Sequence, residues 1–262
     1  MRILVTNDDG FDAVGLAMLV SYLERKNSMA GNSDLWEITV LAPDSERSGV
    51  SHAMTLKKPT KVRKLSEKLY TCSGTPADCL IVAGLGVVSE KPDVVISGIN
   101  RGPNLGTDII YSGTCGAARQ AALEGIPAIA VSCAEYKSDL HYEACAAFVA
   151  NNLSALISAW QPDTFINING PSSLEENLEA VWAVPGRNRY IDQLKCFDGA
   201  DGYKYCFLTE GRHERTPDPV SDHHAVMSGK IAISLIGVHP VSTHDNSLNG
   251  KPFLEFYVDS TS

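Results

Sequence analysis

The first 170 residues alternate between short apolar segments and longer amphipathic segments. Short apolar runs are typical of buried strands, whereas apolar positions spaced by three or four residues indicate helices. The predicted strands are Arg2–Thr6, Trp36–Ala42, Val94–Ser97, Pro127–Ser132 and Thr164–Asn169. The predicted helices are Val14–Arg25, Ala77–Val88, Gly113–Leu123 and His141–Trp160. Strands separated by helices predict an α/β fold with a mainly parallel sheet that is covered on both faces.

Several segments interrupt or follow this alternation. A polar insert occupies Lys26–Asp34, and short extended pieces are expected around Met54–Arg63 and Lys68–Cys72. After Gly170, several prolines, a GADG turn at 199–202 and the alternating segment KYCFL predict hairpins and long loops. We therefore divide the chain into a core over residues 1–170 and a β-rich extension, or arm, over residues 171–262. We expect the arm to complete the fold and to make oligomer contacts.

Asp8 and Asp9 follow the first predicted strand directly. Neighbouring side chains of a strand point to opposite faces, so two aspartates inside the strand could not share a ligand. Gly10 permits a tight turn at the carboxyl end of the strand, where both carboxylates can converge. Hard oxygen donors of this kind suit Mg²⁺ or Mn²⁺. The alternative interpretation is a solvated Asn-Asp-Asp-Gly turn.

Two more polar loops follow predicted strands and are expected at the same edge of the sheet. The second strand runs into APDSERSGVSH, where the hydroxyl of Ser48 could face a metal ion, although a helix cap or local turn is an alternative role. The strand at Val94–Ser97 runs into SGINRGPNLGTDIIYSGT, where Asn100 offers a neutral amide oxygen. With two aspartates, these residues would make an oxygen ligand set that leaves positions for water.

The segment from Asn104 to Thr114 has the composition of a phosphate-binding loop. Ser112 and Thr114 offer hydroxyls, and Gly113 opens a predicted helix. The N-terminus of a helix binds phosphate through unpaired N–H groups and the helix dipole. An ordinary capped helix is the alternative, and no P-loop or dinucleotide fingerprint is present.

The composition of the chain disfavours several classes of protein. Asp and Glu number 31 against 22 Lys and Arg, a net charge of −9, which disfavours binding to a nucleic-acid polymer. No apolar stretch is long enough to span a membrane, and the first apolar run is too short for a signal peptide, so we expect a cytoplasmic protein. The seven cysteines form no C-x-x-C pair and lie in apolar segments, which predicts buried free thiols.

The order and content of these motifs resemble the SurE family of survival-protein nucleotidases. The matching blocks are MRILVTNDDG at the start, APDSERSG at 42–49, GTPADC at 74–79, SGINRGPNLGTDIIYSGT at 97–114 and ALEGIPAIAVS at 122–132. They cover most of the first 170 residues. The segment at 221–240 matches only loosely, and the tail beyond Pro240 has no match.

The resemblance implies a fold, an activity and an assembly. The fold would be a Rossmann-like three-layer α/β/α sandwich with a mainly parallel sheet and a C-terminal arm exchanged between subunits, giving a homodimer or homotetramer. The implied activity is a metal-dependent 5′/3′-nucleotidase that hydrolyses nucleoside monophosphates, with short polyphosphate as a further substrate. The implied cofactor is one divalent ion per subunit, Mg²⁺ or Mn²⁺, with Ca²⁺ as an alternative.

The resemblance also implies roles for particular residues. The family's metal ligands fall on Asp8, Asp9, Ser48 and Asn100, and its phosphate contacts fall on Asn104, Ser112, Gly113 and Thr114. The resulting hypothesis is hydrolysis by a metal-activated water, with Asp8 and Asp9 as the catalytic pair. None of His213, His223, His224 and His239 is assigned a role.

Three alternatives to this hypothesis are disfavoured by the sequence. A covalent aspartyl-phosphate route is disfavoured because such phosphatases place a second aspartate two residues after the nucleophile, and position 10 is glycine. A non-catalytic nucleotide-binding regulator would have no need for all four metal ligands. A dehydrogenase would need G-x-G-x-x-G after the first strand, where this chain has NDDGFDAVG.

Overall fold

The computed structural model describes residues 1–29, 35–88, 90–135 and 140–241. Nine strands form one sheet in the order β3-β4-β2-β1-β5-β6-β7-β11-β8. In chain order they are β1 (Arg2–Thr6), β2 (Glu37–Pro43), β3 (Val62–Ser66), β4 (Leu69–Cys72), β5 (Val94–Arg101), β6 (Ala128–Cys133), β7 (Thr164–Gly170), β8 (Ala180–Trp182) and β11 (Ile231–Gly237). The pairs β3–β4 and β7–β11 are antiparallel, and the other neighbours are parallel.

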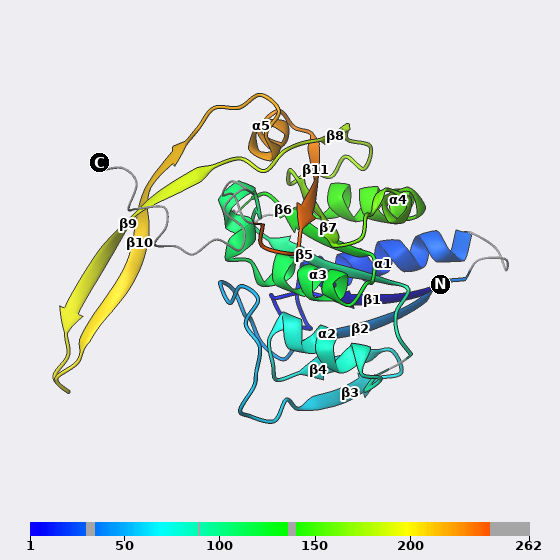
Figure 1. The fold of residues 1–262 in the computed structure, drawn as a ribbon, viewed down its shortest axis with the longest axis horizontal. Coiled ribbons are helices and arrows are strands. Elements are labelled where there is room, and N and C mark those ends of the chain that lie inside the picture. Colours follow the sequence, from blue (N-terminus) through cyan, green and yellow to red (C-terminus); the bar gives the residue numbers. More distant parts are fainter. Residues whose placement is uncertain (30–34, 89, 136–139, 242–262) are drawn as a thin grey trace, which may run out of the picture.

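Helices cover both faces of the sheet (Figure 1). They are α1 (Val14–Met29), α2 (Pro76–Gly84), α3 (Gly113–Leu123), α4 (Glu143–Ala159) and the short α5 (Asp222–Met227). Because side chains alternate along a strand, Ile3 and Val5 of β1 join a buried cluster with α1 and α4, whereas Leu4 joins one with α2 and α3. The mainly parallel, three-layer α/β fold expected from the sequence is therefore confirmed.

Several predicted boundaries differ from the structure. Strand β5 continues to Arg101, four residues past the predicted end at Ser97, so Asn100 lies within it. Helix α1 continues to Met29, so the predicted insert begins inside it, and residues 30–34 of that insert lie outside the described residues. Helix α2 ends at Gly84, short of the predicted Val88, and Gly86 follows with a φ of +80°, which only glycine adopts readily. The extended piece expected around 54–63 is a strand only from Val62 onward.

After Gly170, two strands, β8 and β11, return to the main sheet. Between them in sequence, β9 (Asn188–Asp198) and β10 (Lys204–Arg215) form a separate antiparallel hairpin that extends away from the layered body (Figure 1). The GADG segment makes its turn, with the Gly199 N–H donating to the Tyr203 carbonyl at 2.7 Å. The hairpin expected here is present, while the division of the chain at residue 170 stays a prediction.

The cysteines correct one sequence expectation. Cys72, Cys79, Cys115, Cys133 and Cys145 are buried free thiols, as predicted. Cys196 and Cys206, however, face each other across the hairpin and form a disulfide. Apolar neighbours in sequence suggested burial, but on a two-stranded ribbon such residues remain exposed, and cross-strand register decides the pairing.

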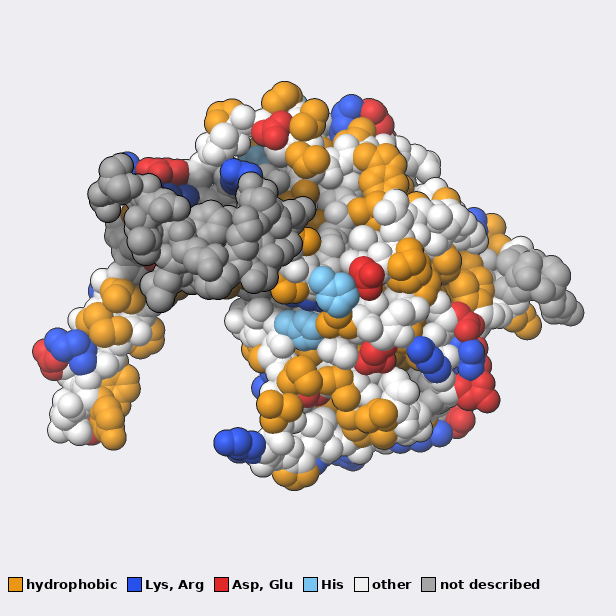
Figure 2. All heavy atoms as spheres, viewed as in Figure 1, with side chains coloured by type: hydrophobic (Ala, Val, Ile, Leu, Met, Phe, Trp, Pro, Cys, Tyr) orange, Lys and Arg blue, Asp and Glu red, His pale blue; other side chains and the backbone are white. Residues whose placement is uncertain are grey.

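The hairpin exposes a large apolar surface. Six of its hydrophobic side chains are each about half exposed or more, namely Leu194, Phe197, Tyr203, Tyr205, Phe207 and Leu208. Figure 2 shows hydrophobic side chains along this projection, apart from the main body. In the described part of the chain, no helix is both long and apolar enough to cross a membrane.

Candidate active site

Three loops meet at the carboxyl edge of the sheet, because β1 lies between β2 and β5. The turn after β1 is closed by Asn7, whose side chain accepts from the Gly10 N–H at 3.2 Å and donates to the Gly10 carbonyl at 2.8 Å. Gly10 has a φ of +108°, which explains the need for glycine. The Arg47 N–H donates to the Asp8 carbonyl at 2.7 Å and so joins the loop after β2 to this turn.

Asp8 is a buried carboxylate held from the start of α3. Its side chain is 3% exposed, and its Oδ2 accepts from the Thr114 N–H at 3.1 Å. The Thr114 hydroxyl donates to the other oxygen, Oδ1. Burial raises the pKa of Asp8 above its ordinary value, although these hydrogen bonds oppose the shift. A buried carboxylate of this kind is stabilised as an anion when a cation binds beside it.

Gly113 allows the helix to approach Asp8 closely. A Cβ atom at this position would lie 2.9 Å from both Cβ and Oδ2 of Asp8, which is closer than real Cβ atoms come. Any larger residue would therefore push α3 away from the aspartate. Glycine is needed here because the helix backbone lies so close to Asp8, and not because of an unusual backbone angle.

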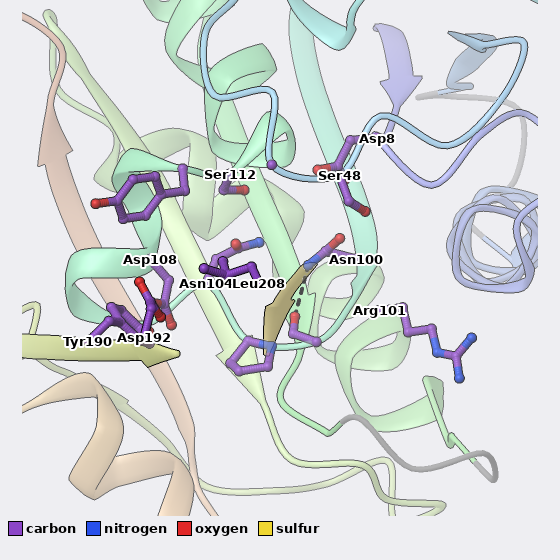
Figure 3. Close-up of a pocket in the computed structure, with 14 residues that line it drawn as sticks. Asp8, Ser48, Asn100, Arg101, Asn104, Asp108, Ser112, Tyr190, Asp192 and Leu208 are labelled. Atoms are coloured by element: carbon purple, nitrogen blue, oxygen red, sulfur yellow. Dashed lines mark hydrogen bonds between the residues drawn. The ribbon is translucent and has the colours of Figure 1, made fainter. Parts of the chain in front are cut away.

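Asp8, Ser48 and Asn100 line one cavity of about 470 Å³ (Figure 3). The Asn100 side-chain nitrogen donates to the Gly102 carbonyl at 2.9 Å. Since a carbonyl only accepts, this contact identifies the nitrogen and leaves the amide oxygen turned toward Asp8 and Ser48 (Figure 3). The Ser48 hydroxyl donates to Glu46 at 2.8 Å, so its oxygen keeps lone pairs for another partner.

Asp9 lies beside this cavity and not among the residues that line it. It faces an adjoining hollow with Glu46, Arg101 and Tyr142, and its Oδ2 accepts from the Arg101 N–H at 3.0 Å. Burial raises the pKa of Asp9 to about 6; the Arg101 N–H lowers it, and repulsion from Asp8 adds to the rise. The two aspartates are thus neighbours with carboxylates in adjoining hollows.

The four positions expected to contact phosphate divide into two groups. Asn104 and Ser112 line the cavity. The Asn104 side chain donates to the Ser132 hydroxyl at 2.7 Å, and Ser112 caps α3 by accepting from the Cys115 N–H at 3.0 Å. Gly113 and Thr114 are buried behind the cavity lining, and both contact Asp8. The structure thus places them as supports of Asp8.

The opposite wall of the cavity comes from the hairpin, through Tyr190, Asp192 and Leu208 (Figure 3). The Tyr190 hydroxyl donates to Asp108, another lining residue, and its ring contacts that of His213 edge-on at 4.7 Å. Burial raises the pKa of Asp108, and the Tyr190 hydrogen bond opposes the shift. Sequence reasoning did not find these three hairpin residues, because nothing in their local pattern relates them to loops about eighty residues earlier.

The donor set fits a hard divalent cation. Within the described residues, no group of three His, Cys, Asp or Glu side chains is arranged to hold a metal ion. A cation here would therefore depend on neutral oxygens beside the aspartates. The amide oxygen of Asn100, which has no hydrogen bond among the described residues, and the hydroxyl of Ser48 provide such oxygens on the same cavity as Asp8. Oxygen-only ligands of mixed charge are those that Mg²⁺ and Mn²⁺ accept.

Known proteins resemble this chain in both sequence and fold. The family model for survival protein SurE matches residues 3–192. A protein of Thermoanaerobacter sp. (strain X514) named 5′-nucleotidase SurE is 39% identical over 255 residues, 95% of this chain and 96% of its own. One of the same name from Geobacter sulfurreducens is 39% identical over 236 residues, covering 89% and 87%.

A solved structure extends the likeness to three dimensions. The crystal structure of the SurE protein from Aquifex aeolicus superposes with a TM-score of 0.76 at 28% identity, covering 95% of this chain and 97% of that one. The family match spans the loops that carry Asp8, Ser48, Asn100 and Asn104 and reaches the first strand of the hairpin. The chain therefore belongs to the survival protein SurE family.

Proposed function

We propose that this protein is a nucleotidase that hydrolyses nucleoside 5′-monophosphates to nucleoside and phosphate. The observation that carries the proposal is the cavity itself, which is lined by Asp8, Ser48 and Asn100 together with Asn104 and with Ser112, the N-cap of α3. Relatives that cover nearly the whole chain are named 5′-nucleotidases, which supports the same activity here. Nucleoside 3′-monophosphates and short polyphosphate are further substrates within the proposal.

We assign one divalent cation per subunit, Mg²⁺ or Mn²⁺, to Asp8, Asp9, Ser48 and Asn100. When bound, such an ion neutralises charge on phosphoryl oxygens and lowers the pKa of a coordinated water. Thr114 fixes the direction of both Asp8 oxygens. In the described residues Asp9 has one oxygen engaged by Arg101, so its other oxygen is available to orient a water molecule.

The chain's own groups would hold the phosphoryl group. Asn104 is 5% exposed and is fixed from three sides: its N–H donates to Asn169 at 2.8 Å, its side chain donates to Ser132, and its carbonyl accepts from Asn167 at 2.9 Å. A group fixed in this way loses little freedom when substrate binds. Together with the N-terminal end of α3, it would stabilise charge as it develops on the equatorial oxygens.

The nucleoside would lie toward the hairpin. Tyr190 offers a flat ring held by contacts with Asp108 and His213, among others. Leu208 offers an apolar surface, and Asp192 a carboxylate that can accept from sugar or base donors. The carboxylates of Asp108 and Asp192 on this wall disfavour further phosphoryl groups, so we expect polyphosphate to be a poorer substrate than a nucleoside monophosphate.

We further propose that the hairpin joins copies of the chain into a homodimer or homotetramer. A two-stranded ribbon on its own is marginally stable in water. The exposed apolar row of this hairpin supplies a surface that association would bury. Measurement of the mass in solution by light scattering tests this, and a monomer at micromolar concentration would exclude it.

The activity is tested by phosphate release from a panel of nucleoside 5′- and 3′-monophosphates and tripolyphosphate. Each reaction is run in EDTA and again with excess Mg²⁺ or Mn²⁺. We expect metal-dependent release from at least one 5′-monophosphate. Binding of nucleotide without release under every condition would contradict the enzyme and favour a nucleotide-binding regulator.

A further inference from the structure

A second cavity, of about 480 Å³, lies at the base of the hairpin. Three segments form it: the start of β9, the end of β10 with the loop that follows, and α5. Four of its lining side chains are cationic or can become so, namely Arg187, Arg215, His223 and His224. Such a concentration is unusual in a chain with a net charge of −9.

The two arginines of this cavity differ from their neighbours on the same hairpin. Arg189 and Arg212 each reach Glu214, at 3.8 Å. Within the described residues, Arg187 and Arg215 have no carboxylate at salt-bridge distance. One acidic residue, Asp218, also lines the cavity, and its Oδ1 accepts from the Val220 N–H at 3.0 Å. Among the described residues, no ion pair therefore occupies the guanidinium groups of Arg187 and Arg215, although Asp108 attracts Arg215 at longer range.

The nearby buried carboxylate, Asp222, attracts the His223 imidazole electrostatically but makes its hydrogen bonds with backbone N–H groups. Asp222 is 1% exposed, and its two oxygens accept from the N–H groups of Gly106 at 2.7 Å and Gly186 at 2.9 Å. His223 N–H is a third donor, at 2.7 Å. Asp222 is occupied in tying the hairpin base to the loop before α3, so its hydrogen-bonding capacity is directed away from the cavity.

We propose that this second cavity binds an anion that carries phosphoryl groups, separately from the catalytic cavity. Guanidinium groups pair with phosphate through two parallel hydrogen bonds, and imidazole N–H groups add single donors. The volume is similar to that of the catalytic cavity, so it has room for a nucleotide or a short polyphosphate as well as for inorganic phosphate. The assignment is independent of the proposed function.

The first residues of β9 contribute to both cavities. Asn188 lines the second cavity and Tyr190 the catalytic one. The Thr107 hydroxyl donates to the Asn188 carbonyl and accepts from its N–H, both at 3.0 Å, which fixes this stretch of strand to the catalytic loop. A bound anion therefore contacts the strand that carries the nucleoside-facing tyrosine.

Calorimetric titration in EDTA tests the site with three probes: inorganic phosphate, AMP and tripolyphosphate. Comparison of the three shows whether the site prefers free phosphate, a nucleotide or a polyphosphate. Arg187→Gln/Arg215→Gln is compared with Arg189→Gln/Arg212→Gln, a nearby control with the same change of charge, at residues within β9 and β10. We expect the first pair to weaken binding of at least one probe by about tenfold or more, and the control pair by about threefold at most. Equal weakening by both pairs would show general attraction to the hairpin and overturn the proposal.

Hydrogen exchange locates the binding without any substitution. Addition of the tightest probe should slow exchange of backbone amides in 186–188 and 215–224. Protection confined to 100–112 would place the anion in the catalytic cavity and overturn the proposal, as would an absence of binding at millimolar concentration. If the double variant does not fold, Arg215→Gln alone and this measurement decide the question.

Discussion

Thr114 donates to both oxygens of Asp8, through its backbone N–H to Oδ2 and through its hydroxyl to Oδ1. A threonine at the start of a helix thus fixes the direction of a carboxylate that follows a strand more than a hundred residues earlier. The pair is buried, so water cannot replace either hydrogen bond.

Thr114→Val should reduce turnover while the fold remains. Valine keeps the shape and removes the hydroxyl, so Asp8 loses one buried, charge-assisted hydrogen bond, worth about 1.5–3 kcal/mol. If that interaction serves the transition state, kcat falls by about ten- to a hundredfold. The control is Thr71→Val, because the buried Thr71 hydroxyl has no hydrogen-bond partner among the described residues. Unchanged kcat in Thr114→Val would remove its positioning role.

Asp9→Asn should separate activity from stability. At saturating Mg²⁺ we expect turnover to fall severely. In EDTA at pH 7.5 the same variant should be more stable than the wild type by about 1–2 kcal/mol, after allowance for solvent screening. The reason is that burial raises the pKa of Asp9 to about 6, so the ionised carboxylate disfavours folding.

Because the pKa of Asp9 is raised in the folded protein, the direction in which stability changes with pH can be predicted. Between about pH 4 and 6 the folded wild type holds the Asp9 proton more tightly than the unfolded chain, so wild-type stability falls as pH rises through this window. Urea unfolding of both proteins in EDTA at pH 4 and 7.5 measures the difference. A stability gain that is the same at both pH values would contradict this explanation.

Asp78→Asn should destabilise the protein at neutral pH. The Asp78 carboxylate accepts from the Thr55 N–H at 2.9 Å, the Thr55 hydroxyl at 2.6 Å and the Thr75 N–H at 2.8 Å, and it completes the capping box of α2. Burial alone would raise the pKa of Asp78, but these hydrogen bonds outweigh it and the pKa lies below its ordinary value. We expect a loss of about 1–3 kcal/mol in the free energy of unfolding.

This loss should shrink in acid. A lowered pKa contributes stability that is present above about pH 4 and disappears as pH falls through the folded-state value. Urea unfolding at pH 7 and pH 3 tests the prediction, with Asp198→Asn as the control, because the Asp198 side chain is 84% exposed on the hairpin. An equal loss in the two variants at pH 7 would refute the role of the capping network.

Tyr190→Phe should affect nucleotides more than simple phosphate esters. The ring stays, but the hydrogen bond to Asp108 that fixes it is lost. We expect KM for a nucleoside monophosphate to rise by about three- to tenfold with little change for p-nitrophenyl phosphate, which has no nucleoside. Tyr203→Phe, near the hairpin turn and 72% exposed, is the control. The same change in KM for both substrates would place Tyr190 outside the nucleoside end.

The sequence predicts those parts of the cavity that depend on strand ends. Asp8 and Ser48 follow β1 and β2, and Asn100 lies in the neighbouring strand β5, one residue before its end. Parallel strands bring their carboxyl ends to one edge. The sequence could not predict that the Thr114 side chain points toward Asp8 and not into the cavity. This orientation depends on how closely Gly113 lets α3 approach Asp8. The position of Tyr190 in the cavity could not be predicted from the residues around it. It depends on the path of the hairpin, which is set by contacts between distant residues such as Thr107 and Asn188.

The hairpin leaves and re-enters the body at adjacent points. The Val184 N–H donates to the Val220 carbonyl at 3.0 Å, and the Asp222 N–H donates to the Val184 carbonyl at 2.8 Å. The intervening residues therefore form an insertion whose ends are already joined. Such an insertion can change in length and sequence while the sheet and the aspartate loops keep theirs. Changes within this segment would therefore alter the wall that carries Tyr190, Asp192 and Leu208 and leave the paired ends in place.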